Sequence, residues 1–366
     1  MSRAVLLLLV LVAAGCAAVP PPSPATPGAT VDPSSPPAEP ARAALARGQA
    51  LLARGEMAAA AAALREALRR EPELTEARAA LGVALHGLGD LDAAVEELRV
   101  ALRRQPEAVD VRLALARALV ARQEWPAARE ELERVLAARP EQVDARYALG
   151  VVRYAQGDVA GAIDAYQRVL GTDPGQQDAR FNLALVLKLA RREAEAAPEF
   201  VAAAEAGHAR AQYFAGTAYA GGLGVEASLA TAIAWWFRAA EQGVVQAEEA
   251  LAQQRQVALG RSRRPPAERQ AAEQAFADYR AALWKEFPDL APGADDTVGG
   301  ALLRQGRARE AVAVLIREAA ALSQPALRLL EALYEQGVDG QVTARDARIL
   351  SYLKGAAAEG LRPPVR

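Results

Sequence analysis

Residues 143–174 decide the fold, and their sequence is VDARYALGVVRYAQGDVAGAIDAYQRVLGTDP. The stretch holds two amphipathic segments separated by Gly157-Asp158. Glycine can end a helix because it tolerates positive φ, and proline prevents a helix from continuing. Four prolines follow a period of thirty-four residues: Pro72, Pro106, Pro140 and Pro174. A fixed period of this length predicts stacked helical hairpins in an all-α protein.

Blocks aligned on these prolines repeat small residues where the two helices of a hairpin would approach each other. Gly82 and Gly150 hold the same place in the second and fourth blocks, and Leu98 and Tyr166 are expected to fill the space beside them. This pattern resembles the tetratricopeptide repeat. The resemblance implies a right-handed α-solenoid of antiparallel helical hairpins, with five repeats over residues 41–206.

Arginine replaces the tryptophan that the tetratricopeptide family often has early in each repeat: Arg78, Arg112, Arg146 and Arg180. An acid stands two residues before each arginine: Glu76, Asp110, Asp144 and Asp178. One interpretation is an anion-binding strip. The interpretation that we favour places both rows at helix starts, where the helix dipole stabilises the acids and the arginine stems pack on apolar surface.

A different repeat follows the fifth block. Residues 207–250 contain Gly216, Gly222-Leu-Gly224 and Trp235-Trp236, and they resemble a Sel1-like repeat. The resemblance implies a further helical hairpin in the same solenoid. Gly222-x-Gly224 also matches a loose dinucleotide fingerprint, but that fingerprint needs a preceding strand, so no cofactor is expected.

The C-terminal part is predicted to continue with helices. Residues 251–291 are predicted to form a basic linker and a helix from Ala267 to about Phe287. We expect the basic stretch, residues 261–266, to be a solvated connection; the alternative is contact with anionic head groups or cell wall. Residues 292–362 resemble worn tetratricopeptide-like and Sel1-like hairpins, the first of them marked by Gly299 and Leu315.

The N-terminus indicates export. An apolar run of eleven residues is too short for a permanent membrane span and is typical of a secretory signal. Residues 11–16, LVAAGC, resemble the lipobox of bacterial lipoproteins, and this resemblance implies a signal over residues 1–16 and a lipid on Cys16. The alternative is an incidental cysteine in an ordinary cleaved signal. Residues 17–40 are rich in proline and are predicted to form a disordered tether.

The sequence offers few groups for catalysis. It holds one cysteine and two histidines, His86 and His208, so no metal cluster of His and Cys is expected. It contains neither a Gly-x-Ser-x-Gly elbow nor a phosphate loop. We therefore predict no enzyme activity, no catalytic residue, no cofactor and no metal. The formal net charge of −2 does not favour a nucleic-acid partner.

The tetratricopeptide resemblance implies that the first helix of each hairpin lines a concave groove. Its inward places give a predicted protein-binding ribbon: Leu45, Gln49, Leu52, Val83, His86, Leu113, Arg117, Val120, Tyr147, Val151, Tyr154, Phe181, Leu185 and Lys188. An exposed apolar surface of this kind indicates a binding site, and it suits an apolar helix or an extended peptide. The alternative is that the superhelix itself, or the proline-rich tail, covers these side chains.

The sequence therefore predicts a non-enzymatic scaffold for protein–protein interaction, lipid-anchored in the cell envelope. We expect it at the outer membrane facing the periplasm, with a periplasmic or outer-membrane protein segment as its partner and no small-molecule substrate. By analogy of architecture it would assist envelope, secretin or pilus assembly. The alternative function is a Sel1-type hydrolase active on cell wall or β-lactams, which the missing histidine, thiol and serine motifs disfavour.

Overall fold

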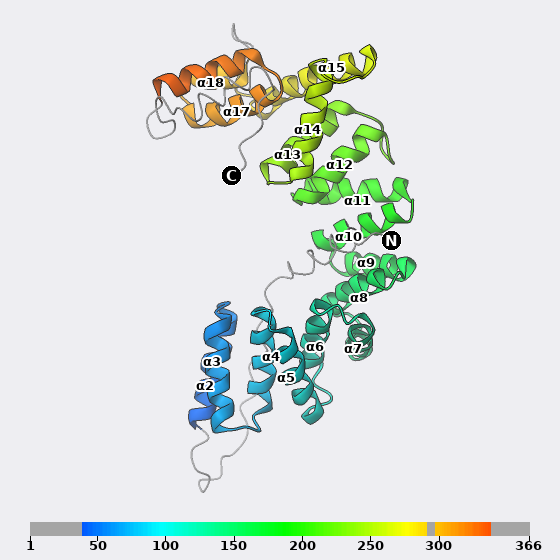
Figure 1. The fold of residues 1–366 in the computed structure, drawn as a ribbon, viewed down its shortest axis with the longest axis vertical. Coiled ribbons are helices and arrows are strands. Elements are labelled where there is room, and N and C mark those ends of the chain that lie inside the picture. The colour runs from blue at the N-terminus through cyan, green and yellow to red at the C-terminus, as the bar shows by residue number, and fades with distance from the viewer. Residues whose placement is uncertain (1–38, 291–296, 338–366) are drawn as a thin grey trace. The chain divides into compact units, whose positions relative to one another are not determined.

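The computed structural model describes residues 39–290 and 297–337, and all regular secondary structure in these ranges is helical (Figure 1). The predicted all-α class is confirmed. The chain divides into two compact units, Met1–Val186 and Leu187–Arg366, here called the first unit and the second unit. The predicted signal, most of the predicted tether and the end of the last predicted repeat lie outside the described residues.

The first unit is a series of antiparallel helical hairpins. Its helices are α2 (Glu39–Ala53), α3 (Met57–Arg70), α4 (Thr75–Gly87), α5 (Leu91–Arg104), α6 (Val109–Ala121), α7 (Trp125–Ala138), α8 (Val143–Ala155), α9 (Val159–Thr172) and the start of α10 (Gln177–Leu189). Each hairpin from α2 to α9 pairs two successive helices, and α3, α5 and α7 each pack on the first helix of the next hairpin. The first helices α2, α4, α6 and α8 also contact one another in succession. This is the solenoid arrangement that the proline period predicts.

Glycine lets the two helices of a hairpin approach closely. A Cβ on Gly82 would lie 2.5 Å from Cγ of Leu98, and a Cβ on Gly150 would lie 2.7 Å from Cε1 of Tyr166. Relaxed carbon contacts are about 3.5 Å or longer, so neither site has room for a methyl group. Leu98 and Tyr166 are fully buried. The predicted roles of these four residues are confirmed.

The turn inside each hairpin places one residue with positive φ at the same position of every block: Gly55, Gly89, Gln123, Gly157 and Arg191. In two blocks the next residue is an aspartate that caps the following helix. Asp90 Oδ1 accepts the N–H of Ala93 at 3.4 Å, and Asp158 Oδ1 accepts the N–H of Gly161 at 2.8 Å. The predicted turns at Gly89-Asp90 and Gly157-Asp158 are therefore confirmed.

The four repeated arginines tie each first helix to the turn before it. Each donates a terminal N–H to the carbonyl of the proline six residues earlier: Arg78 to Pro72 at 2.8 Å, Arg112 to Pro106 at 2.5 Å, Arg146 to Pro140, and Arg180 to Pro174 at 3.0 Å. Two of these arginines also reach a glutamate on the next helix: Arg78 reaches Glu97 at 2.8 Å, and Arg112 reaches Glu131 at 2.6 Å. The arginine row is a structural link, and it does not form the alternative anion-binding strip.

Two of the acids that precede these arginines form ion pairs with an arginine on another helix or at its end. Asp110 accepts from Arg139 at 2.6 Å, and Asp144 accepts from Arg117 at 2.8 Å. Both acids stand in the first turn of a helix, as expected. Their second role was not predicted: Asp110 pairs with Arg139 at the end of α7 in its own hairpin, and Asp144 on α8 pairs with Arg117 on α6 of the previous hairpin.

The second unit continues with helices. They are α11 (Glu193–Glu205), α12 (Ala209–Gly221), α13 (Leu229–Glu241), α14 (Val245–Ala258), α15 (Pro266–Leu283), the 3₁₀ turn η1 (Trp284–Glu286), α16 (Val298–Arg304), α17 (Ala308–Ala320) and α18 (Gln324–Gln336). The glycine device recurs: a Cβ on Gly216 would lie 2.6 Å from Trp236, and a Cβ on Gly299 would lie 2.3 Å from Leu315. The helix expected from Ala267 to about Phe287 corresponds to α15 and η1. Within the described ranges, no helix is long and apolar enough to cross a bilayer.

A buried carboxylate on α17 caps the first turn of α16. Glu318 is 2% exposed and accepts the N–H groups of Val298 at 2.7 Å and Gly299 at 3.1 Å. Burial raises the pKa of Glu318, and these two hydrogen bonds oppose the shift. The side chain thus satisfies two N–H groups that a helix start leaves without a partner, which is a structural role.

Candidate protein-binding groove

The first helices carry the predicted ribbon. Leu45, Gln49 and Leu52 lie on α2, Val83 and His86 on α4, Leu113, Arg117 and Val120 on α6, Tyr147, Val151 and Tyr154 on α8, and Phe181, Leu185 and Lys188 on α10. Because α2, α4, α6 and α8 contact one another in succession, the first eleven residues follow one row of helices. They therefore lie on successive helices that contact one another.

Burial divides the ribbon into two classes. Six of its members belong to the packed interior, with at most 8% of their surface exposed: Leu113, Val120, Val151, Tyr154, Phe181 and Leu185. The remaining eight are partly exposed: Leu45, Gln49, Leu52, Val83, His86, Arg117, Tyr147 and Lys188. In this conformation only the second class is accessible to a partner. The six buried residues therefore follow the alternative stated above, in which the fold itself covers the side chains of the ribbon.

The accessible part within the first unit combines apolar side chains with isolated polar groups. Leu45 and Leu52 are partly exposed while they pack on the core of the unit. Arg117 gives an N–H to Asp144 at 2.8 Å, so its charge is balanced. Burial lowers the pKa of His86, and the nearby Arg117 lowers it further. His86 is therefore a neutral imidazole at pH 7, which can donate and accept hydrogen bonds.

A cluster of tyrosines and one asparagine closes the far end of the ribbon in the first unit. Asn182 on α10 donates an N–H to the hydroxyl of Tyr147 at 2.9 Å, which places α10 beside α8. The rings of Tyr147 and Tyr166 lie 5.9 Å apart. Burial is the largest cause that raises the pKa of Tyr166 well above its usual value. The hydroxyls of Tyr154 and Tyr166 are buried and make no hydrogen bond with any described residue.

Asn182 is a ribbon neighbour that the sequence analysis missed. The residues one, two and three blocks earlier are Ala148, Ala114 and Ala80. An amide that replaces alanine at one place of an otherwise apolar repeat is the signal that could have identified it. Its hydrogen bond orients Tyr147, the one aromatic side chain of the ribbon that is partly exposed.

Lys188 lies in the second unit. Its ammonium group stands 4.6 Å from the centre of the Phe214 ring, a cation–π distance. Burial lowers the pKa of Lys188, and Glu193 opposes this shift. Lys188 is thus occupied by contacts within its own unit.

The polar residues considered for chemistry have structural contacts. His208 begins α12 and accepts the N–H of Ala211 at 3.1 Å. Gly222 and Gly224 have positive φ in the loop between α12 and α13, where a Cβ on Gly224 would lie 2.3 Å from the carbonyl oxygen of Glu193. This loop follows a helix, so it lacks the strand that a dinucleotide site needs. Among the described residues, no group of three or more His, Cys, Asp or Glu side chains could hold a metal ion.

Comparison with solved structures gives matches that cover somewhat less than half of this chain. The structure titled MamA 41-end from Desulfovibrio magneticus RS-1 is 26% identical, with a TM-score of 0.44 over 46% of this chain and 95% of that chain. The structure titled Crystal structure of MamA is 26% identical, with a TM-score of 0.41 over 45% of this chain and 97% of that chain. No curated protein matches the chain.

Comparison with family models gives one match. Residues 40–109 and 113–177 match the tetratricopeptide repeat. These two ranges cover the hairpins from α2 to α9, so the helices that carry the first eleven ribbon residues lie within the part of the chain that matches the tetratricopeptide repeat.

Proposed function

We propose that the protein is a scaffold whose groove, formed by the first helices of the first unit, holds an apolar helix or an extended peptide of another protein. The observation that carries this proposal is the row of partly exposed side chains on α2, α4, α6 and α8, within the range that matches the tetratricopeptide repeat. Repeat arrays of this type offer extended surfaces on which a partner contacts several successive helices.

The accessible side chains suit such a ligand. Leu45, Leu52 and Val83 offer apolar surface, while Gln49 and His86 offer hydrogen bonds that can fix the register of a peptide. Tyr147 adds an aromatic ring whose hydroxyl is already oriented by Asn182. Aromatic residues that are rigid before binding are frequent anchors in protein interfaces, because little conformational entropy is lost when they bind.

The proposed location is the cell envelope, where a lipid on Cys16 would hold the protein at the outer membrane facing the periplasm. This part of the proposal rests on residues 11–16 and on the proline-rich residues 17–40, of which all but the last two lie outside the described residues. The variant Cys16→Ser is expected to leave the protein in the soluble fraction or as an unprocessed precursor. Membrane retention equal to that of the parent protein would exclude the lipid anchor.

The groove is tested with a charge placed inside it. Val83→Glu puts a carboxylate on the partly exposed face of α4, and Ala62→Glu puts the same group on the exposed face of α3. We expect Val83→Glu to abolish recovery of the partner from native membranes and Ala62→Glu to preserve it, provided that both variants melt like the parent protein. Equal recovery by both variants would exclude this groove.

A further inference from the structure

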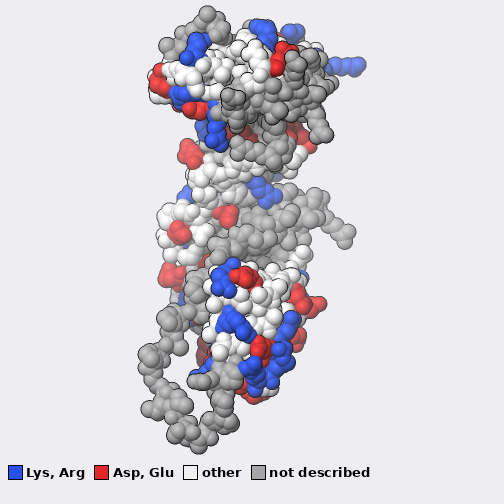
Figure 2. Space-filling model, turned by 90° about the vertical axis from the view of Figure 1, so that its left-hand side faces the viewer, with Lys and Arg blue, Asp and Glu red and all other residues white. Residues whose placement is uncertain are grey.

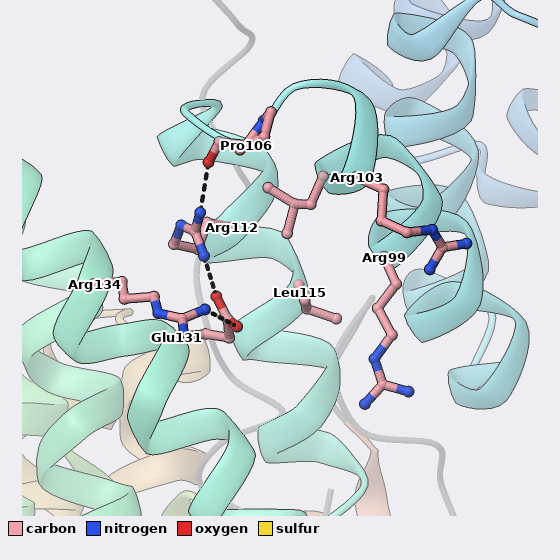
Figure 3. A pocket seen from close by; sticks show the side chains of 8 residues that line it. Arg99, Arg103, Pro106, Arg112, Leu115, Glu131 and Arg134 are labelled. Atoms are coloured by element: carbon pink, nitrogen blue, oxygen red, sulfur yellow. Dashed lines mark hydrogen bonds and ion pairs between the residues drawn. The ribbon is translucent and has the colours of Figure 1, made fainter.

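A notch of about 270 Å³ lies between α5 and α7 in the first unit (Figure 3). Leu102 on α5 and Leu115 on α6 are among its apolar lining residues. Leu115 stands two residues after Leu113 of the ribbon, which is about 200° around the helix. The notch therefore opens on the side of α6 opposite the groove.

Arginine dominates the lining of the notch. Four arginines and one acid face it: Arg99 and Arg103 on α5, Arg112 on α6, and Glu131 and Arg134 on α7. Figure 3 shows Arg112 and Arg134 directed at Glu131 from one side, while Arg99 and Arg103 stand apart on α5. The notch thus has a neutralised wall on α7 and a basic wall on α5.

The distances explain this asymmetry. Glu131 receives an N–H from Arg112 at 2.6 Å and another from Arg134 at 3.1 Å. Arg99 forms two longer ion pairs, with Glu96 at 3.4 Å and with Glu124 at 3.9 Å. Arg103 is exposed and forms no ion pair with any residue that the structure describes. The α5 wall therefore holds one guanidinium group, that of Arg103, which no described acid pairs, beside Arg99, whose contacts with Glu96 and Glu124 are long.

The basic wall extends to the preceding hairpin and stops after α5. Thirty-four residues before Arg99 and Arg103 stand Arg65 and Arg69, which are exposed on α3 and also lack an ion pair within the described part of the chain. Thirty-four residues after them stand Glu133 and Ala137. The arginines are thus not required by the repeat, because the fold accepts other residues at the same places.

The chemistry of the wall points to carboxylates. A guanidinium group offers a planar fork of donors that matches a carboxylate, and the apolar floor fits the methylene groups of a glutamate side chain. Each exposed ion pair contributes little alone, so useful affinity needs several pairs along one ligand. A polypeptide with several acids meets this need.

A membrane surface fits less well. Glu66 on α3, Glu96 on α5 and Glu130 on α7 stand among the arginines. On the face that Figure 2 draws, acidic side chains lie next to basic ones in several places. A continuous plane of anionic head groups would meet these acids as well as the arginines. A narrow acidic peptide can follow the arginine pairs and avoid the acids.

We propose that Arg99 and Arg103, extended by Arg65 and Arg69, form a second docking site that binds an acidic peptide segment of a protein, with one carboxylate seated in the notch. This site is separate from the groove, so a scaffold of this kind would hold two different segments at once.

The test uses the purified full-length protein and a fluorescent ten-residue peptide rich in glutamate. Binding is measured by anisotropy at low ionic strength, and the same peptide with glutamine in place of glutamate is the control ligand. We expect Arg99→Gln with Arg103→Gln to weaken binding of the acidic peptide by about tenfold or more, since two charge-assisted contacts are lost. Arg129→Gln with Arg168→Gln is the matched control, because these arginines pair with acids four residues away on their own helices.

A charge reversal separates a specific site from general attraction. Arg99→Glu with Arg103→Glu should abolish binding of the glutamate peptide and create binding of a lysine-rich peptide. Equal affinity of the two glutamine double variants for the acidic peptide would overturn the proposal. A second outcome would also overturn the proposal: the parent protein binds vesicles of anionic phosphatidylglycerol but not the acidic peptide. If Arg99→Gln with Arg103→Gln then abolishes the vesicle binding, the wall is a membrane contact.

Discussion

Gln123 occupies, with a φ of 62°, the same position in its hairpin turn that Gly89 occupies one repeat earlier with a φ of 80°. A side chain at positive φ costs about 1–2 kcal/mol relative to the usual helical region, whereas glycine adopts it without strain. The repeat thus holds a glutamine in a conformation that its neighbouring repeats reserve for glycine.

The substitution Gln123→Gly should therefore stabilise the protein. We expect the free energy of unfolding to rise by up to about 1 kcal/mol, because the relief of strain exceeds the entropy that glycine adds to the unfolded chain. Urea denaturation followed by circular dichroism measures the change. The reciprocal variant Gly89→Gln should lower the free energy of unfolding by a similar amount. If neither variant changes it, the claim that Gln123 is strained is contradicted.

Gly150→Ala tests the close approach of α8 and α9. The new methyl group would meet the ring of Tyr166 at 2.7 Å, and because both residues are buried the helices must move apart. We expect a loss of about 1–3 kcal/mol in the free energy of unfolding. Gly171→Ala is the matched control in α9, since a Cβ there meets no atom within 4 Å. A Gly150→Ala variant as stable as the control would show that the contact is not tight.

His86 gives the protein a pH dependence of known sign. The folded state lowers the pKa of His86, mainly by burial, so the unfolded chain takes up a proton near pH 6.5 while the folded imidazole does so only at lower pH. The stability that depends on His86 is complete above this window and is lost as the pH falls through it. Between pH 7.5 and about 5, the melting temperature should fall more steeply with decreasing pH for the parent protein than for His86→Gln. Parallel pH profiles would contradict the assignment.

Two tyrosines of the ribbon should separate binding from stability. Tyr154 is 2% exposed, so Tyr154→Ala is expected to cost about 3–5 kcal/mol of stability, as large truncations in a core do. Tyr147 is partly exposed, and Tyr147→Ala should instead lower the affinity for the partner by about tenfold or more if the ring is an anchor. Calorimetry and a binding assay on both variants distinguish the two roles. Equal loss of stability in both would place Tyr147 in the core as well.

The hairpins could be predicted because their signals are local. Pro106 and Pro140 fix where second helices end, Gly89 and Gly157 fix the turns, and Gly150 fixes a close approach. The burial of Tyr154 and Phe181 could not be predicted, since exposure on the inner face depends on how tightly successive first helices pack. That packing is a tertiary property with no local signal.

The partners of the polar residues could not be predicted from the sequence either. Arg112 always follows Pro106 by six residues, and its counterparts do the same in the other repeats. This period does not show that the guanidinium group turns back and donates to the proline carbonyl. The basic wall at Arg99 and Arg103 was overlooked for a related reason. Its charge is unusual only after Glu131 is seen to neutralise Arg112 and Arg134.

The central claim is that a protein segment occupies the groove formed by the first helices, and site-specific photocrosslinking tests it most directly. A photoreactive phenylalanine at Val83 faces the groove, and the same residue at Ala62 faces solvent on α3. Irradiation of cells that carry each variant, followed by mass spectrometry of the products, should give one defined peptide from another protein at Val83 and none at Ala62. Equal products at both positions, or none at Val83, would contradict the account.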